Sequence, residues 1–140
     1  MDHLIDHYYI GSAQDAQNSE ILRLFEIAVM INLTEVPDPV YEGLEYFQLN
    51  QPDNAPVLEA TAKLFLGFID SLSDHRPVLI HCAAGISRTA AFTSALLVYR
   101  YGLSWDESLA LVKQKRPRCN PSPVLLESLR MHLPDISRSR

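Results

Sequence analysis

Short apolar runs alternate with longer segments of helical periodicity along this chain of 140 residues. The runs are rich in β-branched and aromatic residues, and proline or polar residues flank them, which is typical of strands in a buried sheet. Strands are therefore predicted over Leu4–Ile10, Ala28–Leu33, Leu44–Leu49 and Val78–His81. Pro37 and Pro39 indicate one loop between these strands, and residues 51–56 indicate another.

The periodic segments predict the helices. Between Val57 and Leu72 the apolar residues recur three or four positions apart, which gives a helix with one buried face. The segment Thr89–Tyr101 is apolar nearly all round, so we expect a central, buried helix that Gly102 caps. Further helices are expected from the N-cap Ser12, over Glu20–Phe25, from the capping box at Ser104 and Glu107 to Lys115, and over Pro123–His132.

The order of these elements predicts the fold class. Strands that alternate with helices favour an α/β domain with a central, mostly parallel twisted sheet and helices on both sides. In such sheets, ligands bind at the carboxyl ends of the strands. We expect one domain over residues 1–134, followed by a short polar tail over 135–140 that frays.

Composition and charge narrow the classes of function. The chain is 47% hydrophobic and 21% charged, as expected for a globular domain. A formal net charge of −5 argues against general nucleic-acid binding. No apolar run approaches the length of a membrane span, and Met1-Asp2-His3 does not begin a signal peptide. With two cysteines and no disulfide scaffold, a cytoplasmic location is expected.

The loop between the strand Val78–His81 and the helix Thr89–Tyr101 carries the candidate chemistry. It places the thiol of Cys82 and the guanidinium of Arg88 at a helix N-terminus, where unpaired amides bind anions and stabilise a thiolate. Gly85 allows a tight curl, and Arg88 offers a fork that matches two phosphate oxygens. The loop is thus suited to attack on phosphorus by Cys82. The backbone amides expected to cradle the substrate are those of Ala83, Ala84, Gly85, Ile86, Ser87 and Arg88.

At these residues the chain resembles the cysteine-dependent protein tyrosine phosphatases, whose signature is His-Cys-x5-Arg-Ser/Thr. The sequence Gly-Ile-Ser-Arg at 85–88 is similar to the dual-specificity branch rather than the tyrosine-specific branch. The resemblance implies the phosphatase fold and hydrolysis of phosphotyrosine, phosphoserine and phosphothreonine in protein substrates through a phosphocysteine. It also implies no metal and no other cofactor. Neutral residues at Ala83, Ala84 and Ile86 argue against phosphoinositide substrates, because relatives that act on them often carry lysines there.

The resemblance assigns two further catalytic roles. Asp53 lies in the loop that carries the family's general acid, and its separation from Cys82 resembles the family's spacing. Without the resemblance, a turn aspartate is the simpler interpretation. Thr89 matches the hydroxyl that bonds the thiolate and eases its departure, and it also suits a helix start.

Other residues are expected to brace the loop. His81 is expected to order it rather than transfer protons, and Ser87 to support it by local hydrogen bonds. The family commonly has Pro-Asn before the last helix, whereas this chain has Pro121 and Ser122, so the asparagine's bracing role does not carry over.

Two alternatives of other classes stay open. A phosphate-binding module on the same fold is one, although Cys82, Arg88 and Asp53 are all present. A rhodanese-like sulfurtransferase also binds an anion beside a loop cysteine, but it lacks this signature. Within the phosphatases, a tyrosine-preferring enzyme is the other possibility. The physiological substrate and the oligomeric state cannot be predicted from these residues.

Two features near the C-terminus have plain interpretations. Cys119 is interpreted as a loop or core cysteine, with a disulfide to Cys82 as the less favoured hypothesis. The basic residues Lys113, Lys115, Arg116 and Arg118 are interpreted as a solvated helix end, since cations favour helix C-termini. The less supported hypothesis is that they attract acidic phosphosites.

Overall fold

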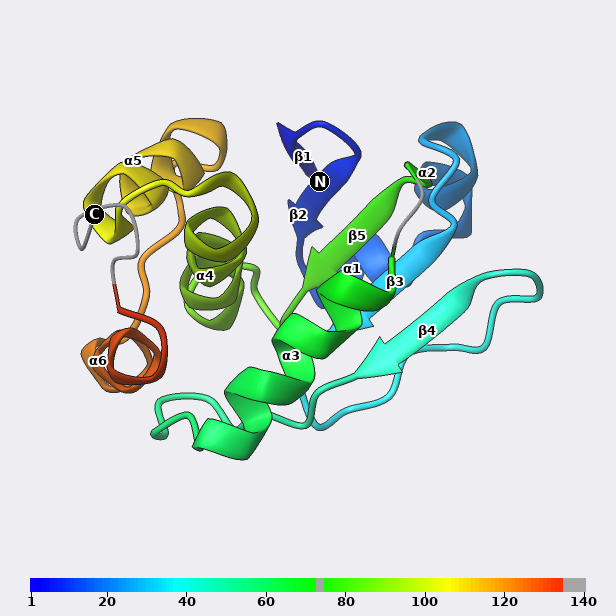
Figure 1. Cartoon of the computed structure of the whole chain (residues 1–140). Coiled ribbons are helices and arrows are strands. Elements are labelled where there is room, and N and C mark those ends of the chain that lie inside the picture. The colour runs from blue at the N-terminus through cyan, green and yellow to red at the C-terminus, as the bar shows by residue number, and fades with distance from the viewer. Residues whose placement is uncertain (73–74, 135–140) are drawn as a thin grey trace.

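The computed structural model describes residues 1–72 and 75–134, so the predicted tail over 135–140 lies outside the described residues. Strands, single or in pairs, alternate with helices up to residue 101, and two further helices follow (Figure 1). The elements are β1 Asp2–Ile5, β2 Tyr8–Gly11, α1 Ala13–Ala16, α2 Ser19–Leu24, β3 Val29–Asn32, β4 Glu45–Gln48, α3 Glu59–Ser71, β5 Val78–His81, α4 Arg88–Tyr101, α5 Trp105–Lys115 and α6 Pro123–His132.

The sheet has the strand order β1-β2-β5-β3-β4. β2, β5, β3 and β4 run parallel, and only β1 is antiparallel to its neighbour. β5 is central, with Gly11 of β2 and Asn32 of β3 in register with His81 at its carboxyl end. The predicted mostly parallel sheet is confirmed, and its central strand delivers the candidate loop.

The prediction of one strand over Leu4–Ile10 is wrong. The chain reverses at Asp6, whose φ is 49°, and β1 pairs back on β2 with His3 opposite Tyr9. Aspartate tolerates the left-handed region better than most residues, so it can make this turn. The sequence pattern hid the turn because only two polar residues, Asp6 and His7, separate the apolar residues of the two arms.

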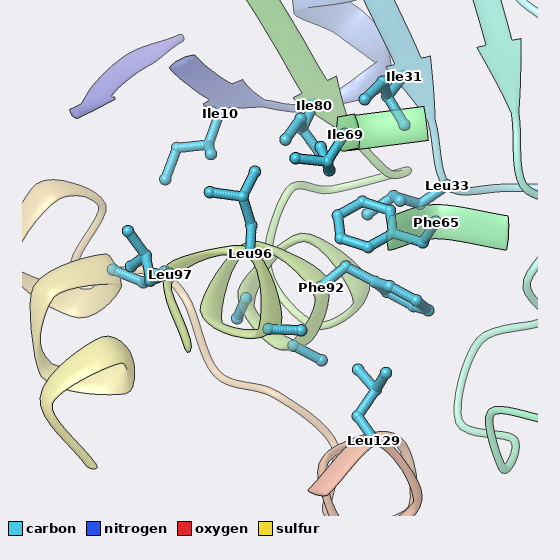
Figure 2. Close-up of a cluster of buried hydrophobic side chains, with 14 of the residues drawn as sticks. Ile10, Ile31, Leu33, Phe65, Ile69, Ile80, Phe92, Leu96, Leu97 and Leu129 are labelled. Carbon is cyan, nitrogen blue, oxygen red and sulfur yellow. The ribbon is translucent and has the colours of Figure 1, made fainter. Parts of the chain in front are cut away.

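Helices cover both faces of the sheet, also as predicted. Ile10, Ile31 and Ile80 point toward α4, where Phe92 and Leu96 meet them (Figure 2). The neighbouring residues Met30 and Leu79 alternate to the other face, where they pack with residues of α1 and α2. The larger cluster also takes in residues of α3, α5 and α6.

α4 is the buried central helix that the sequence predicts, although it begins at Arg88, one residue before the predicted start. Its residues are buried from Arg88 to Val98, and Gly102 caps it in the left-handed conformation, with φ 68°. Because α4 is packed on several sides, its N-terminus is held firmly against the end of β5. None of the helices in the described residues is long and apolar enough to cross a membrane.

Candidate active site

The loop from Cys82 to Ser87 has its carbonyl groups held from outside. The carbonyl of Cys82 accepts from His81 Nδ1 at 3.1 Å, and that of Ala83 accepts from the amide of Ala13 at 2.9 Å. The next two carbonyls, of Ala84 and Gly85, accept from Arg116 Nη2 at 3.2 Å and Arg116 Nε at 2.8 Å. The carbonyl of Ile86 accepts from the amide of Asn120 at 3.0 Å. All peptide bonds described are trans, so each amide points opposite to the preceding carbonyl. The amides from Ala83 to Ser87 therefore face the inner side of the loop, as anion binding requires.

Gly85 is the residue that permits this curl. Its φ is +71°, and an added Cβ would lie 2.6 Å from the carbonyl oxygen of Gly11 and 2.7 Å from Arg116 Nη2. Both the backbone conformation and the close packing behind the loop therefore require glycine here.

Gly85→Ala is expected to destabilise the protein more than Gly102→Ala. Both glycines have positive φ, but a Cβ at Gly102 meets nothing within 4 Å. The loss of unfolding free energy in Gly102→Ala then measures the conformational cost alone, about 1–2 kcal/mol. The clash at Gly85 adds about 1–3 kcal/mol. Urea unfolding of the two variants measures the difference, and equal losses of unfolding free energy would show that the packing behind Gly85 is loose.

Cys82 lies at the carboxyl end of β5 and is buried. Its sulfur accepts hydrogen bonds from the hydroxyl of Thr89 at 3.0 Å and from the amide of Thr89 at 3.4 Å. Both donors sit in the first turn of α4 and direct their hydrogen bonds at the sulfur. The structure thus brings Cys82 and Thr89 together.

Arg88 and Asp53 meet across the same opening. Arg88 Nη1 donates to the carbonyl of Gln51 at 3.0 Å, and its Nε lies 3.9 Å from Asp53 Oδ1. Arg88 is buried, whereas the Asp53 side chain is 57% exposed. The buried Gln51 holds the turn by donating to the carbonyls of Pro52 and Ala55. The predicted acid loop therefore lies against the predicted phosphate loop.

His81 joins the loop to a residue that the sequence analysis missed. Its Nε2 lies 2.6 Å from Asp38 Oδ2, and both side chains are almost fully buried. Its Nδ1 bonds the carbonyl of Cys82. A carbonyl and an ionised carboxylate can only accept, so both ring nitrogens donate when the imidazole is doubly protonated. This arrangement fixes the orientation of the imidazole beside the nucleophile's backbone.

A hydrogen-bond network places Asp38. Asn32, at the end of β3, donates from Nδ2 to the carbonyl of Val36 at 2.8 Å and to the hydroxyl of Tyr46 at 2.9 Å. The Tyr46 hydroxyl in turn accepts from the amide of Asp38 at 3.1 Å. The sequence analysis took this segment as a simple proline-bounded loop, and only the flanking Pro37 and Pro39 suggested a fixed conformation.

Ser87 is braced from the turn before α6. The amide of Ser122 donates to Ser87 Oγ at 3.0 Å, while Ser122 Oγ caps α6 by accepting from Leu125 N–H. Ser122 stands where the family commonly has asparagine, and here its backbone supports the loop.

The interpretation of Arg116 as part of a solvated helix end is wrong. Arg116 is buried behind the loop, while Lys113, Lys115 and Arg118 are exposed. Cys119 is buried beside it, with its sulfur 3.8 Å from the carbonyl oxygen of Gly85. Burial raises the pKa of the Cys119 thiol to about 11. At neutral pH Cys119 is therefore protonated, a poor state for attack on an oxidised Cys82.

An open cavity of about 340 Å³ lies over the loop. Asp53, Ala83 and Arg88 line one part of it, and the segment from Thr34 to Asp38 lines another. In the described part of the chain, no group of three or more His, Cys, Asp or Glu side chains could hold a metal ion.

Comparison with known proteins is consistent with this geometry. Residues 8–133 match the family described as "Dual specificity phosphatase, catalytic domain". The chain is 30% identical to mouse dual specificity protein phosphatase 15 over 131 residues, or 92% of this chain and 56% of that protein. It is 31% identical to dual specificity protein phosphatase 18 of Pongo abelii over 130 residues, or 86% and 66% of the two chains. A crystal structure of DUSP15 aligns with a TM-score of 0.86 at 26% identity, covering 98% of this chain and 89% of that chain.

Proposed function

The chain belongs to the dual specificity phosphatase family, and we propose that it hydrolyses phosphate monoesters on proteins through a phosphocysteine intermediate. The observation that carries this proposal is the convergence of Cys82, Arg88 and Asp53 around the inward-facing amides of one loop. The chain spans only 56% of its mouse relative, so the proposal concerns this domain, taken as residues 1–134.

In the first step, the Cys82 thiolate attacks phosphorus, and the bond from phosphorus to the ester oxygen breaks. The loop amides and the Arg88 fork hold the phosphoryl oxygens as charge shifts among them in the transition state. Asp53 gives its proton to the departing oxygen, which leaves as an alcohol or phenol. Its exposed side chain at the rim of the cavity can reach a leaving group on a protein surface.

In the second step, water attacks the phosphocysteine. Asp53, now ionised, takes the proton of that water, and phosphate leaves as the phosphorus–sulfur bond breaks. The Thr89 hydroxyl donates to the sulfur at 3.0 Å and so stabilises the departing thiolate. Thiolate, amides and guanidinium supply the nucleophile and the positive field, so the reaction as proposed uses no metal.

His81 has a positioning role in this mechanism. It fixes the carbonyl of Cys82, and Asp38 fixes the imidazole in turn. Neither His81 nor Asp38 needs to exchange a proton with the substrate.

The proposed substrates are phosphorylated proteins with phosphotyrosine, phosphothreonine or phosphoserine, as the family name indicates. A reducing compartment such as the cytoplasm suits this function, because the thiol of Cys82 must stay free, and both cysteines are free thiols here. A tyrosine-preferring enzyme and a binding module on the same fold are the competing proposals.

Purified protein is expected to hydrolyse an aryl phosphate in the presence of EDTA. It is also expected to release phosphate from the same peptide phosphorylated on tyrosine or on threonine, measured as kcat/KM for each. Turnover of the tyrosine peptide alone would favour the tyrosine-preferring alternative. Binding of either peptide without any turnover would favour the binding module, and activity that needs an added divalent ion would contradict the mechanism.

A further inference from the structure

The guanidinium of Arg116 lies behind the phosphate loop, on the side away from the inward-facing amides. Arg116 is the C-cap residue that follows α5, and it is 7% exposed. Its Nε donates to the carbonyl of Gly85 at 2.8 Å and its Nη2 to the carbonyl of Ala84 at 3.2 Å. Its Nη1 pairs with Asp2 Oδ2 of β1 at 2.7 Å. Each nitrogen of the fork thus has a fixed partner.

The two carbonyls that Arg116 holds are at the centre of the loop. The carbonyls on either side, of Ala83 and Ile86, are held by the backbone amides of Ala13 and Asn120. The centre of the loop is therefore held mainly by the Arg116 side chain, with the thiol of Cys119 as a second and longer contact to the carbonyl of Gly85, at 3.8 Å. A planar guanidinium can bond two successive carbonyls at once, whereas an ammonium group cannot reproduce that fork.

The orientation of these carbonyls decides where the amides point. Because each peptide is planar and trans, fixing the carbonyls of Ala84 and Gly85 outward fixes the amides of Gly85 and Ile86 inward. A positive charge close behind the loop also favours an anion in front of it. Arg116 can thus act on a bound oxyanion without touching it.

Asp2 completes the arrangement from the other end of the chain. Its carboxylate lies 114 positions from Arg116 and meets the nitrogen that does not contact the loop. The pair turns the fork toward the carbonyls and offsets the cost of burying the guanidinium. The burial of Arg116 and its three fixed partners argue against direct contact with a substrate.

We propose that Arg116, oriented by Asp2, is a positioning residue that sets the loop amides for oxyanion binding. The inference rests on the proposed function of this loop as a phosphoryl site, and it names the residues that control that site's affinity.

Tungstate binding to the Cys82→Ser protein tests the proposal apart from catalysis. In that background, Arg116→Lys is expected to weaken tungstate binding by about 10- to 100-fold, as the loss of charge-assisted hydrogen bonds predicts. Asp2→Asn is expected to weaken it by a smaller factor, about 3- to 10-fold, since the neutral amide still accepts one hydrogen bond. Arg118→Lys is the matched control and should bind like the parent protein, because Arg118 is exposed. Titration calorimetry gives the affinities, and thermal unfolding shows that each variant is folded.

The outcomes separate this inference from the proposed function. If folded Arg116→Lys binds tungstate with an affinity within about twofold of the Cys82→Ser parent, the inference about Arg116 is overturned. A lower melting temperature without a loss of tungstate affinity would overturn it as well. If Arg116→Lys does not fold, Asp2→Asn decides by the same criterion. If the Cys82→Ser parent binds tungstate but the wild-type protein hydrolyses no phosphate ester, the proposed function is refuted and this inference still stands. A parent that does not bind tungstate would overturn both.

Discussion

Cys82→Ser is expected to abolish hydrolysis of an aryl phosphate, with a fall in kcat on the order of 10⁴-fold or more. A serine hydroxyl at the same position can accept the bonds from Thr89, but it stays protonated and is a weak nucleophile. The substitution changes one buried atom, so the fold and the loop should persist. Steady-state kinetics with the aryl phosphate, measured beside the wild-type protein, give the effect.

The binding capacity of Cys82→Ser is the control for this experiment. Because the amides and Arg88 are untouched, the variant should still bind inorganic phosphate, and circular dichroism should match that of the wild type. Residual activity close to that of the wild type would remove the covalent step from the mechanism. Loss of both activity and phosphate binding would indicate that the substitution disturbed the loop itself.

The parts of the site that could be predicted from sequence are those encoded within one continuous segment. Cys82, Gly85, Arg88 and Thr89 lie within one strand–loop–helix unit, and local geometry fixes their relation. Asp53 lies elsewhere in the chain and was identified through the resemblance rather than from its own neighbourhood. Its contact with Arg88 follows from the packing of two loops at one end of the sheet.

The residues that the sequence analysis missed or misassigned meet the loop only after folding. Asp38 lies 43 positions from His81, and Arg116 lies 31 positions from Gly85. No local pattern distinguishes a proline-flanked aspartate that pairs with a buried histidine from one in a solvated turn. Likewise, basic residues at the end of a helix look alike in sequence whether they face water or the back of a loop.

The hairpin at Asp6 illustrates the same limit for the fold. Only Asp6 and His7 separate the apolar residues of β1 from those of β2, and the turn depends on a single residue with positive φ. The longer helices were predicted within one or two residues, because periodicity over three or more turns is a stronger signal than one residue's conformation.

Asp53→Asn is expected to slow hydrolysis of phosphothreonine peptides by about 10²- to 10⁴-fold, the usual contribution of a general acid. An alkoxide is a poor leaving group, so its departure needs the proton that asparagine cannot give. Hydrolysis of an aryl phosphate with an acidic phenol should fall much less, because that phenolate leaves without protonation. The measurement is kcat/KM for both substrates with wild type and variant.

The leaving-group dependence makes this result specific to the acid role. Asp53 also lies near Arg88, so its removal could loosen the guanidinium and weaken phosphate binding. Such a loss would slow both substrates by the same factor and weaken inhibition by inorganic phosphate. A series of aryl phosphates separates the two cases: in the variant, the rate should depend steeply on the acidity of the leaving phenol, and in the wild type only weakly. Equal dependence in both proteins would take the general acid role away from Asp53 and leave it a structural part of the loop.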